Sequence, residues 1–136
     1  VLGQITFISE DLLYLEINKE MNLEKEDGVN FRNMILSLFG ENDFSIIVDG
    51  SNFKGHVSMD AIQYFTQDEK FNNLCNFQAI IQNSLSVKLI ANFYIQFASK
   101  NVQSKLFSDY DSALSWVLQR NKLVRNSLNI QNRVKG

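Results

Sequence analysis

The sequence predicts an α/β domain: a single, mostly parallel mixed sheet with an N-terminal antiparallel hairpin and four covering helices, in the order ββαβαβαβα. Three observations predict it. Two segments near the N-terminus alternate apolar and polar residues, as strands do. Short apolar runs typical of strands buried on both faces follow, and they are separated by longer stretches of helical periodicity. Such alternation favours parallel strands joined by right-handed helical crossovers.

The hairpin and the first helix come from the N-terminal third. Residues 4–8 and 13–17 have the strand period, and Ser9-Glu10-Asp11 between them is typical of a turn. The first helix is expected to begin after Asn22 as its N-cap and to end at Gly40. Its buried face is predicted to carry Leu23, Phe31, Met34, Ile35 and Leu38.

The two central strands are predicted at residues 44–48 and 77–81, which are short apolar runs. Asp49-Gly50-Ser51 ends the first of them in a turn. Between the strands, Ser58 is expected to cap a second helix. The inner face of that helix is predicted as Met59, Ile62 and Phe65.

The remaining elements complete the alternation. A third helix is expected to begin at Ser84 or Ser86, and residues 103–107 form a more polar strand, suited to an edge. Ser108 or Asp109 caps a fourth helix. The inward residues of these two helices are predicted as Leu89, Ile90, Phe93, Tyr94 and Phe97, and as Ala113, Leu114, Trp116 and Val117.

The length and the charge distribution of the chain limit how its domains can be organised. The 136 residues fit one domain, and a net charge of −2 argues against a general nucleic-acid binder. The charge is uneven: residues 120–136 carry five basic and no acidic side chains, whereas residues 1–119 carry eight basic and fifteen acidic ones. We expect a domain at 1–120 and a weakly amphipathic basic tail at 121–136. The tail could contact an anionic surface, the acidic body of its own chain, or a second copy in a homodimer.

Other features exclude several classes of protein. The single Cys75 cannot form an internal disulfide, and no His/Cys cluster indicates a metal or another cofactor. No stretch approaches the roughly 20 apolar residues of a membrane span, and we expect no signal peptide before the fold. The sequence therefore predicts a cytoplasmic protein without a transmembrane segment.

One loop gathers candidate site residues. Asp49, Ser51, Lys54 and His56 follow a buried strand at its carboxyl end, where parallel sheets hold ligands. They could form a small polar surface for a ligand or partner, in which Asp49 and His56 share a proton, or simply an ordinary turn. Ser58, at a helix N-terminus, is either a phosphate acceptor or a plain N-cap.

No catalytic set accompanies this loop. The chain has one histidine, no Gly-x-Ser-x-Gly sequence and no glycine-rich loop to hold a phosphate. We therefore expect a protein that is not an enzyme.

A family resemblance extends these expectations. It is carried by Ala79-Ile80-Ile81, by the stretch Val87 to Ala98, and by Leu106-Phe107 followed by Ala113-Leu114-Ser115-Trp116-Val117. Over residues 3–120 the chain resembles the STAS domain, the SpoIIAA-like fold of bacterial anti-sigma-factor antagonists, in a branch related in fold to CRAL-TRIO lipid-transfer domains. Its motifs are mostly packing residues, which specify fold better than activity.

The resemblance implies a regulatory role. In signalling STAS domains, an Asp-Ser pair at the start of the second helix presents a serine for phosphorylation. Ser58 matches that serine, but Val57 replaces the aspartate and the usual glycine after the serine is absent. The resemblance therefore implies a bacterial protein-interaction domain without a working phosphoserine switch.

Three hypotheses follow. The leading one is a non-catalytic domain that contacts a protein partner through residues 49–56 and the helix start at Ser58. The alternative is a small-molecule or lipid carrier, with a cavity of ~300 Å³ or more lined by Phe93, Tyr94 and Phe97. A third, a hydrolase-like enzyme, requires His56 to meet an acid and a nucleophile.

Overall fold

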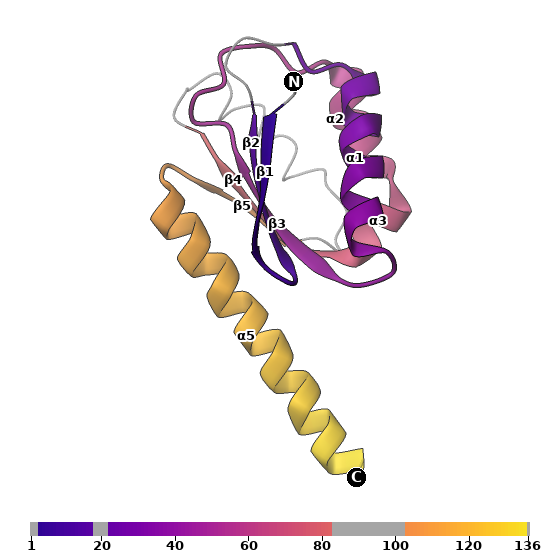
Figure 1. The fold of residues 1–136 in the computed structure, drawn as a ribbon, viewed down its shortest axis with the longest axis vertical. Coiled ribbons are helices and arrows are strands. Elements are labelled where there is room, and N and C mark those ends of the chain that lie inside the picture. The colour runs from indigo at the N-terminus through magenta and orange to yellow at the C-terminus, as the bar shows by residue number, and fades with distance from the viewer. Residues whose placement is uncertain (1–2, 18–21, 83–102, 136) are drawn as a thin grey trace.

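One five-stranded sheet organises the protein and confirms the predicted α/β class (Figure 1). The computed structural model describes residues 3–17, 22–82 and 103–135. The strands lie in the order β1-β2-β3-β4-β5; β1 is antiparallel to β2, and the other neighbours are parallel. The strands are β1 (Gly3–Ser9), β2 (Leu12–Ile17), β3 (Phe44–Asp49), β4 (Cys75–Ile81) and β5 (Gln103–Phe107). The helices are α1 (Lys25–Phe39), α2 (Met59–Gln67), α3 (Glu69–Leu74) and α5 (Tyr110–Lys135).

The two central strands pair as the sequence predicts. β3 and β4 are parallel neighbours, with Ile47 opposite Ala79 and Asp49 opposite Ile81. Ile47 and Ala79 are fully buried, because helices cover both faces of the sheet. Among the described strands β5 pairs with β4 alone, at the expected edge. The carboxyl ends of β2, β3, β4 and β5 therefore gather at one end of the sheet.

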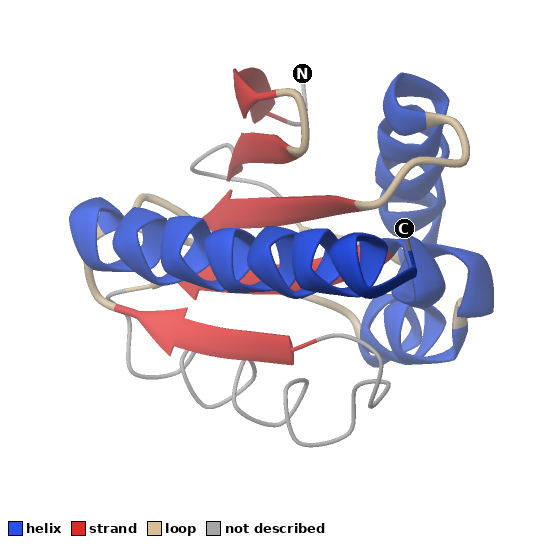
Figure 2. Cartoon of the chain, turned by 90° about the horizontal axis from the view of Figure 1, so that it is seen from below, coloured by secondary structure: helices blue, strands red, loops and turns tan. Residues whose placement is uncertain are grey.

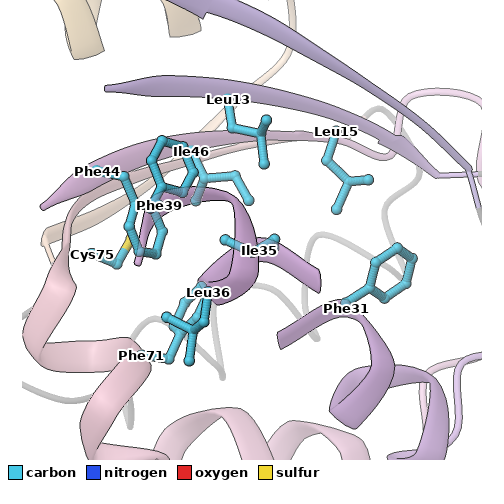
Figure 3. Packing of buried hydrophobic residues seen from close by; sticks show 10 residues of the cluster. All are labelled: Leu13, Leu15, Phe31, Ile35, Leu36, Phe39, Phe44, Ile46, Phe71 and Cys75. Atoms are coloured by element: carbon cyan, nitrogen blue, oxygen red, sulfur yellow. The ribbon is translucent and has the colours of Figure 1, made fainter. Parts of the chain in front are cut away.

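Each face of the sheet has its own apolar core. Figure 1 shows α1, α2 and α3 on one side of the strands and α5 on the other, and Figure 2 shows α5 in front of the strands with the other helices to one side. The first core joins α1 and α3 to the sheet and includes Leu13, Ile35, Phe44 and Phe71 (Figure 3). The second lies under α5 and consists of Leu12, Ile47, Ala79, Ile81, Ala113 and Val117.

Helix α1 begins later than expected and buries a different face. Its N-cap is Glu24, which forms a capping box with Asp27, so the prediction of Asn22 as the cap was wrong. Gly40 ends the helix as predicted: its φ of 62° suits glycine, and its N–H donates to the Leu36 carbonyl oxygen at 2.9 Å.

Aromatic packing sets the rotation of α1. Met34 and Leu38, predicted to be inside, are exposed, whereas Phe39 is buried. The Phe39 ring stacks on Phe44 with centroids 4.6 Å apart and meets Phe7 edge-on at 5.6 Å. Burying this large ring turns the neighbouring side of the helix toward solvent.

The second crossover contains two helices where one was expected. Asp68 ends α2 and caps α3, because its Oδ1 accepts a hydrogen bond from the Phe71 N–H at 2.9 Å. Met59 is 54% exposed, so its predicted inward position was wrong, and Ala61 is buried instead. The side chains of Ile62 and Phe65, and the third predicted helix with Phe93, Tyr94 and Phe97, lie outside the described residues.

Helix α5 is capped by Asp109, one of the two residues proposed for that role. The Asp109 Oδ1 accepts from the Ser112 N–H at 2.8 Å. Ala113 and Val117 are buried as predicted, and Leu114 and Trp116 pack at the margin of the second core. The helix then continues without a break past residue 120 to Lys135, so the basic tail extends it.

Two contacts tie the far part of α5 to the sheet. The Ser45 hydroxyl donates to Asn121 Oδ1 at 2.9 Å in a buried contact, and Arg125 forms an ion pair with Asp11 at 2.5 Å. The basic tail therefore does contact the acidic body of its own chain.

Candidate functional site

The centre of the candidate site is the Asp49 carboxylate at the carboxyl end of β3. Asp49 is only 9% exposed. Its Oδ1 accepts from the Ser51 N–H at 2.9 Å and from the Ser51 hydroxyl at 2.6 Å. Its Oδ2 accepts a short hydrogen bond from the Tyr14 hydroxyl. The two carboxylate oxygens thus close the turn at Ser51 and join it to the neighbouring strand.

These contacts shift the pKa values of both partners. Burial raises the pKa of Asp49, but the hydrogen bonds from Ser51 and Tyr14 outweigh burial and hold it below its usual value. The pKa of Tyr14 is raised, first by burial and then by its hydrogen bond to the Asp49 carboxylate. The pair therefore consists of a carboxylate and a protonated phenol at neutral pH.

Parallel register brings Tyr14 to this position. On β2, Tyr14 is opposite Ile47 of β3, two residues before Asp49, so both side chains lie on the same face of the sheet. The Tyr110 ring at the start of α5 packs edge-on against Tyr14, with centroids 5.3 Å apart. The sequence analysis missed Tyr14. Its position in an alternating strand was the available signal, but its partner depended on strand pairing.

Residues at the end of β4 hold the turn that follows Asp49 in place. The Gly50 N–H donates to the Ile81 carbonyl oxygen at 2.8 Å, and the Gln82 side-chain amide donates to the Gly50 carbonyl oxygen at 2.6 Å. A Cβ at residue 50 would lie 3.1 Å from Gln82 Nε2 and 3.3 Å from the Ile81 carbonyl oxygen. Glycine avoids this crowding, because a Cβ would force the Gln82 amide or the Ile81 carbonyl to shift by a few tenths of an ångström. Phe53, buried beyond the turn, anchors the loop further.

The far end of the loop is fixed by a short parallel bridge between Leu23 and Val57. The Leu23 N–H donates to the His56 carbonyl oxygen at 2.7 Å, and the Ser58 N–H donates to the Leu23 carbonyl oxygen at 2.8 Å. The Asn22 side chain, expected to cap α1, instead accepts from the His56 N–H at 3.3 Å. Both ends of the loop are therefore tied to the body of the domain.

The five predicted site residues occupy one loop but do not form one cluster. Asp49 and Ser51 are in direct contact. Lys54 and His56 are exposed, and within the described part of the chain neither side chain forms a hydrogen bond or ion pair with Asp49. The arrangement expected for proton sharing between Asp49 and His56 is therefore not formed, because Tyr14 and Ser51 occupy the carboxylate.

Ser58 is the N-cap of α2. Its hydroxyl oxygen accepts from the Ala61 N–H at 3.1 Å, and its backbone is extended. This is the plain capping geometry, one of the two interpretations left open by the sequence.

A second, polar groove lies between α1 and the pair α2–α3, with a volume of about 550 Å³. At one side Arg32 Nε contacts Asp68 Oδ2 at 2.8 Å, and Asp68 is largely buried. Burial and the neighbouring Asp68 raise the pKa of Tyr64. The sequence analysis missed this groove. It is lined by Lys25, Arg32, Asp60, Gln63, Tyr64, Gln67, Asp68, Glu69 and Lys70, in which three basic and three acidic side chains balance.

Metal and membrane sites can be assessed over residues 3–17, 22–82 and 103–135. Within these ranges no three His, Cys, Asp or Glu side chains gather where they could hold a metal ion. Among the helices described, none combines the length and hydropathy that a bilayer span requires. Cys75 is buried, and burial raises the pKa of its thiol.

Comparison with known structures supports the fold. The chain is similar to an uncharacterised protein of the DUF3478 family with a SpoIIAA-like fold from Shewanella loihica PV-4. The two are 18% identical, the match covers 84% of this chain and 90% of that one, and the TM-score is 0.58. The predicted STAS-like resemblance is therefore confirmed for the fold, whereas the relation to CRAL-TRIO domains stays a prediction.

Sequence comparison gives the family. No curated protein matches the chain. The model of one family, described as a domain of unknown function (DUF7793), matches residues 6–121, from the first strand to the point at which α5 reaches the end of the sheet. Because that match spans most of the sequence, the chain belongs to the DUF7793 family.

Proposed function

We propose that this protein is a non-catalytic, STAS-type interaction domain, which binds a protein partner through residues 49–58. The SpoIIAA-like fold of a solved neighbour supports a STAS-type role. The location is supported by the loop itself, which lies at the carboxyl end of β3, where side chains of neighbouring parallel strands converge.

The observation that carries the proposal is a firmly held loop with exposed side chains. Hydrogen bonds at Asp49 and Gly50 fix the backbone at the start of the loop, and the bridge between Val57 and Leu23 fixes its end. Lys54 and His56 face solvent between those anchors. A surface ordered before binding loses little conformational entropy when a partner docks, which favours recognition.

Met59 adds an apolar contact beside these polar groups. It is 54% exposed in the first turn of α2, directly after Ser58. Methionine is enriched at the centre of protein interfaces, since its flexible side chain adapts to a partner surface. Lys54, His56 and Met59 together present a positive charge, an imidazole ring and an apolar side chain. This combination suits a partner surface that is partly acidic and partly apolar.

The proposed interaction does not depend on phosphorylation of Ser58. The Ser58 hydroxyl oxygen is occupied as an acceptor at the α2 N-terminus, and Val57 stands where an aspartate precedes the phosphorylated serine of signalling relatives. No catalytic step forms part of the proposal either, because Tyr14 and Ser51 already engage the Asp49 carboxylate.

Partner capture with matched variants tests this proposal. Lys54→Glu/His56→Ala alters the loop, and Gln67→Ala/Lys70→Glu makes the same formal charge change on exposed residues at the other end of α2 and on α3. Both proteins, with the unaltered chain, are used as bait in lysate of the source organism. We expect a partner that is retained by the unaltered chain and the control, and reduced at least about tenfold by the loop variant. Equal retention by all three baits counts against the proposed surface.

A further inference from the structure

The final turns of α5 extend beyond the sheet. Figure 1 shows the C-terminal half of this helix projecting clear of the strands. Its last buried hydrogen bond to the sheet among the described residues joins Asn121 to Ser45, near the amino end of β3, and the ion pair of Arg125 with Asp11 follows one turn later. At 1.5 Å per residue, the helix from Asn121 to Lys135 extends about 20 Å further.

This extension leaves apolar side chains in solvent. Val124 and Leu128 continue the helical stripe of Val117, whose side chain packs on the sheet, but both are exposed. Leu123 and Leu128 are each 53% exposed. With Phe77 of β4 they line a shallow groove of about 300 Å³. An uncovered apolar stripe of this kind is typical of a contact surface.

The charge around the stripe indicates its occupant. Arg120 and the basic tail carry five basic side chains and no acidic one. A large occupant with a basic surface would be repelled, whereas an acidic surface beside apolar residues would be attracted.

An acidic surface of this kind lies on the chain itself, at the same end of the sheet. The β1–β2 turn carries Glu10 and Asp11, and the loop before β3 carries Glu41 and Asp43. The Ser45 N–H donates to the Asp11 carbonyl oxygen at 2.7 Å, which holds this turn against the start of β3. We call these four residues the acidic rim. The ion pair between Arg125 and Asp11 shows that tail and rim are complementary.

We propose that two copies of this chain form a homodimer in which the basic tail of each lies across the acidic rim of the other. A two-fold axis between the two sheet ends makes both contacts identical, so the assembly closes. The apolar stripes of the two tails cover each other at its centre. The intramolecular pair of Arg125 and Asp11 positions the tail for this arrangement.

The first test is the association state of the full chain. We expect a dimer by sedimentation at roughly 100 µM protein in about 50 mM salt, and a dissociation constant at least about tenfold weaker in about 500 mM salt, because salt screens exposed charges. A monomer under both conditions overturns the proposal, including when that monomer binds vesicles of anionic lipid.

Charge reversal then tests the pairing of tail and rim. A rim variant, Glu10→Lys/Glu41→Lys/Asp43→Lys, changes the net charge of the acidic rim from −4 to +2. A tail variant, Lys122→Glu/Arg133→Glu/Lys135→Glu, changes the net charge of residues 121–136 from +4 to −2. Each variant therefore places like charges at both contacts of a homodimer. The tail variant leaves Arg125 and its partner in place. We expect each variant alone to be monomeric and their mixture to form a heterodimer, because the reversed rim then meets the reversed tail. Two monomeric variants that remain monomeric when mixed contradict the proposed pairing.

Two further variants separate pairing from general effects. Glu26→Lys/Asp60→Lys/Glu69→Lys makes the same charge change as the rim variant, in the first turns of α1, α2 and α3. It should dimerise like the unaltered chain. Leu128→Ser should weaken the dimer at least about tenfold and leave monomer unfolding unchanged, because the side chain is exposed in the monomer. Loss of the dimer in the charge control, or full retention in Leu128→Ser, argues against this interface.

Discussion

Removal of one hydroxyl group tests the hydrogen-bonded centre of the candidate site. Tyr14→Phe deletes the donor to Asp49 Oδ2 and leaves both hydrogen bonds from Ser51 to Oδ1 in place. A hydrogen bond to a charged group contributes about 1.5–3 kcal/mol to the free energy of unfolding. Tyr14 is only half-buried, and water can replace part of the lost contact, so we expect a loss of about 1–2 kcal/mol near pH 7.

The lowered pKa of Asp49 determines how the effect of Tyr14→Phe on stability changes with pH. The pKa of Asp49 is lowered in the folded protein, so the stabilisation is present above the unfolded pKa and is lost as the pH falls through the folded pKa. Tyr14→Phe removes one cause of the lowered pKa. The difference between variant and unaltered chain should therefore be largest near pH 7 and should shrink below about pH 4, where the carboxylate becomes protonated.

Urea unfolding at about pH 7 and about pH 3 measures both effects. Tyr110→Phe is the matched control, since its ring packs edge-on against Tyr14 and its hydroxyl makes no hydrogen bond to Asp49. We expect the control to change the free energy of unfolding by less than about 0.5 kcal/mol. Equal losses in the two variants, or a loss in Tyr14→Phe that does not depend on pH, would refute the reasoning.

Three shorter predictions concern other residues. Ser58→Ala should lower the free energy of unfolding by about 1 kcal/mol, and Ser58→Asp should not, because aspartate also caps helices; thermal unfolding of the two variants distinguishes them. Gly50→Ala should cost about 1–3 kcal/mol in urea unfolding, since the new Cβ crowds the Gln82 amide, and a stable variant would show that the turn relaxes freely. Cys75 should react with a thiol reagent only after the protein unfolds, because its thiol is buried with a raised pKa; rapid labelling in buffer would contradict its position in the core.

The strands were predictable because their signal is local. The apolar runs at residues 44–48 and 77–81 have too few polar side chains for any exposed element, and their lengths suit strands. Helix ends with a single strong signal were also found: Gly40 adopts the left-handed conformation that glycine favours, and Ser58 caps α2. In each case the residue type alone limits the possible conformations.

The parts that failed depend on distant contacts. Met34 and Leu38 have the helical spacing of a buried face, but the Phe39 ring packs on Phe44 and Phe7 and thereby decides which face of α1 is inside. Periodicity cannot distinguish two neighbouring faces that both carry apolar residues. The break at Asp68 was missed as well. Asp68 caps α3 through Oδ1, and its Oδ2 pairs with Arg32 across the groove, a contact that sequence spacing does not reveal.

The candidate site likewise has a part that the sequence predicts and a part that depends on distant contacts. Its loop could be located, because the carboxyl end of a parallel strand is a property of the fold class. Its central contact could not, because Tyr14 and Asp49 are 35 residues apart and meet only through the pairing of β2 with β3.

The position of α5 affects how the chain folds during synthesis. Among the described elements it alone covers the face of the sheet that carries Leu12, Ile47, Ala79 and Ile81. Those side chains are synthesised before the helix that covers them. A nascent chain that ends before Tyr110 lacks this cover, and exposed apolar side chains favour aggregation and chaperone binding. Any truncation of the gene before this helix should yield an insoluble product.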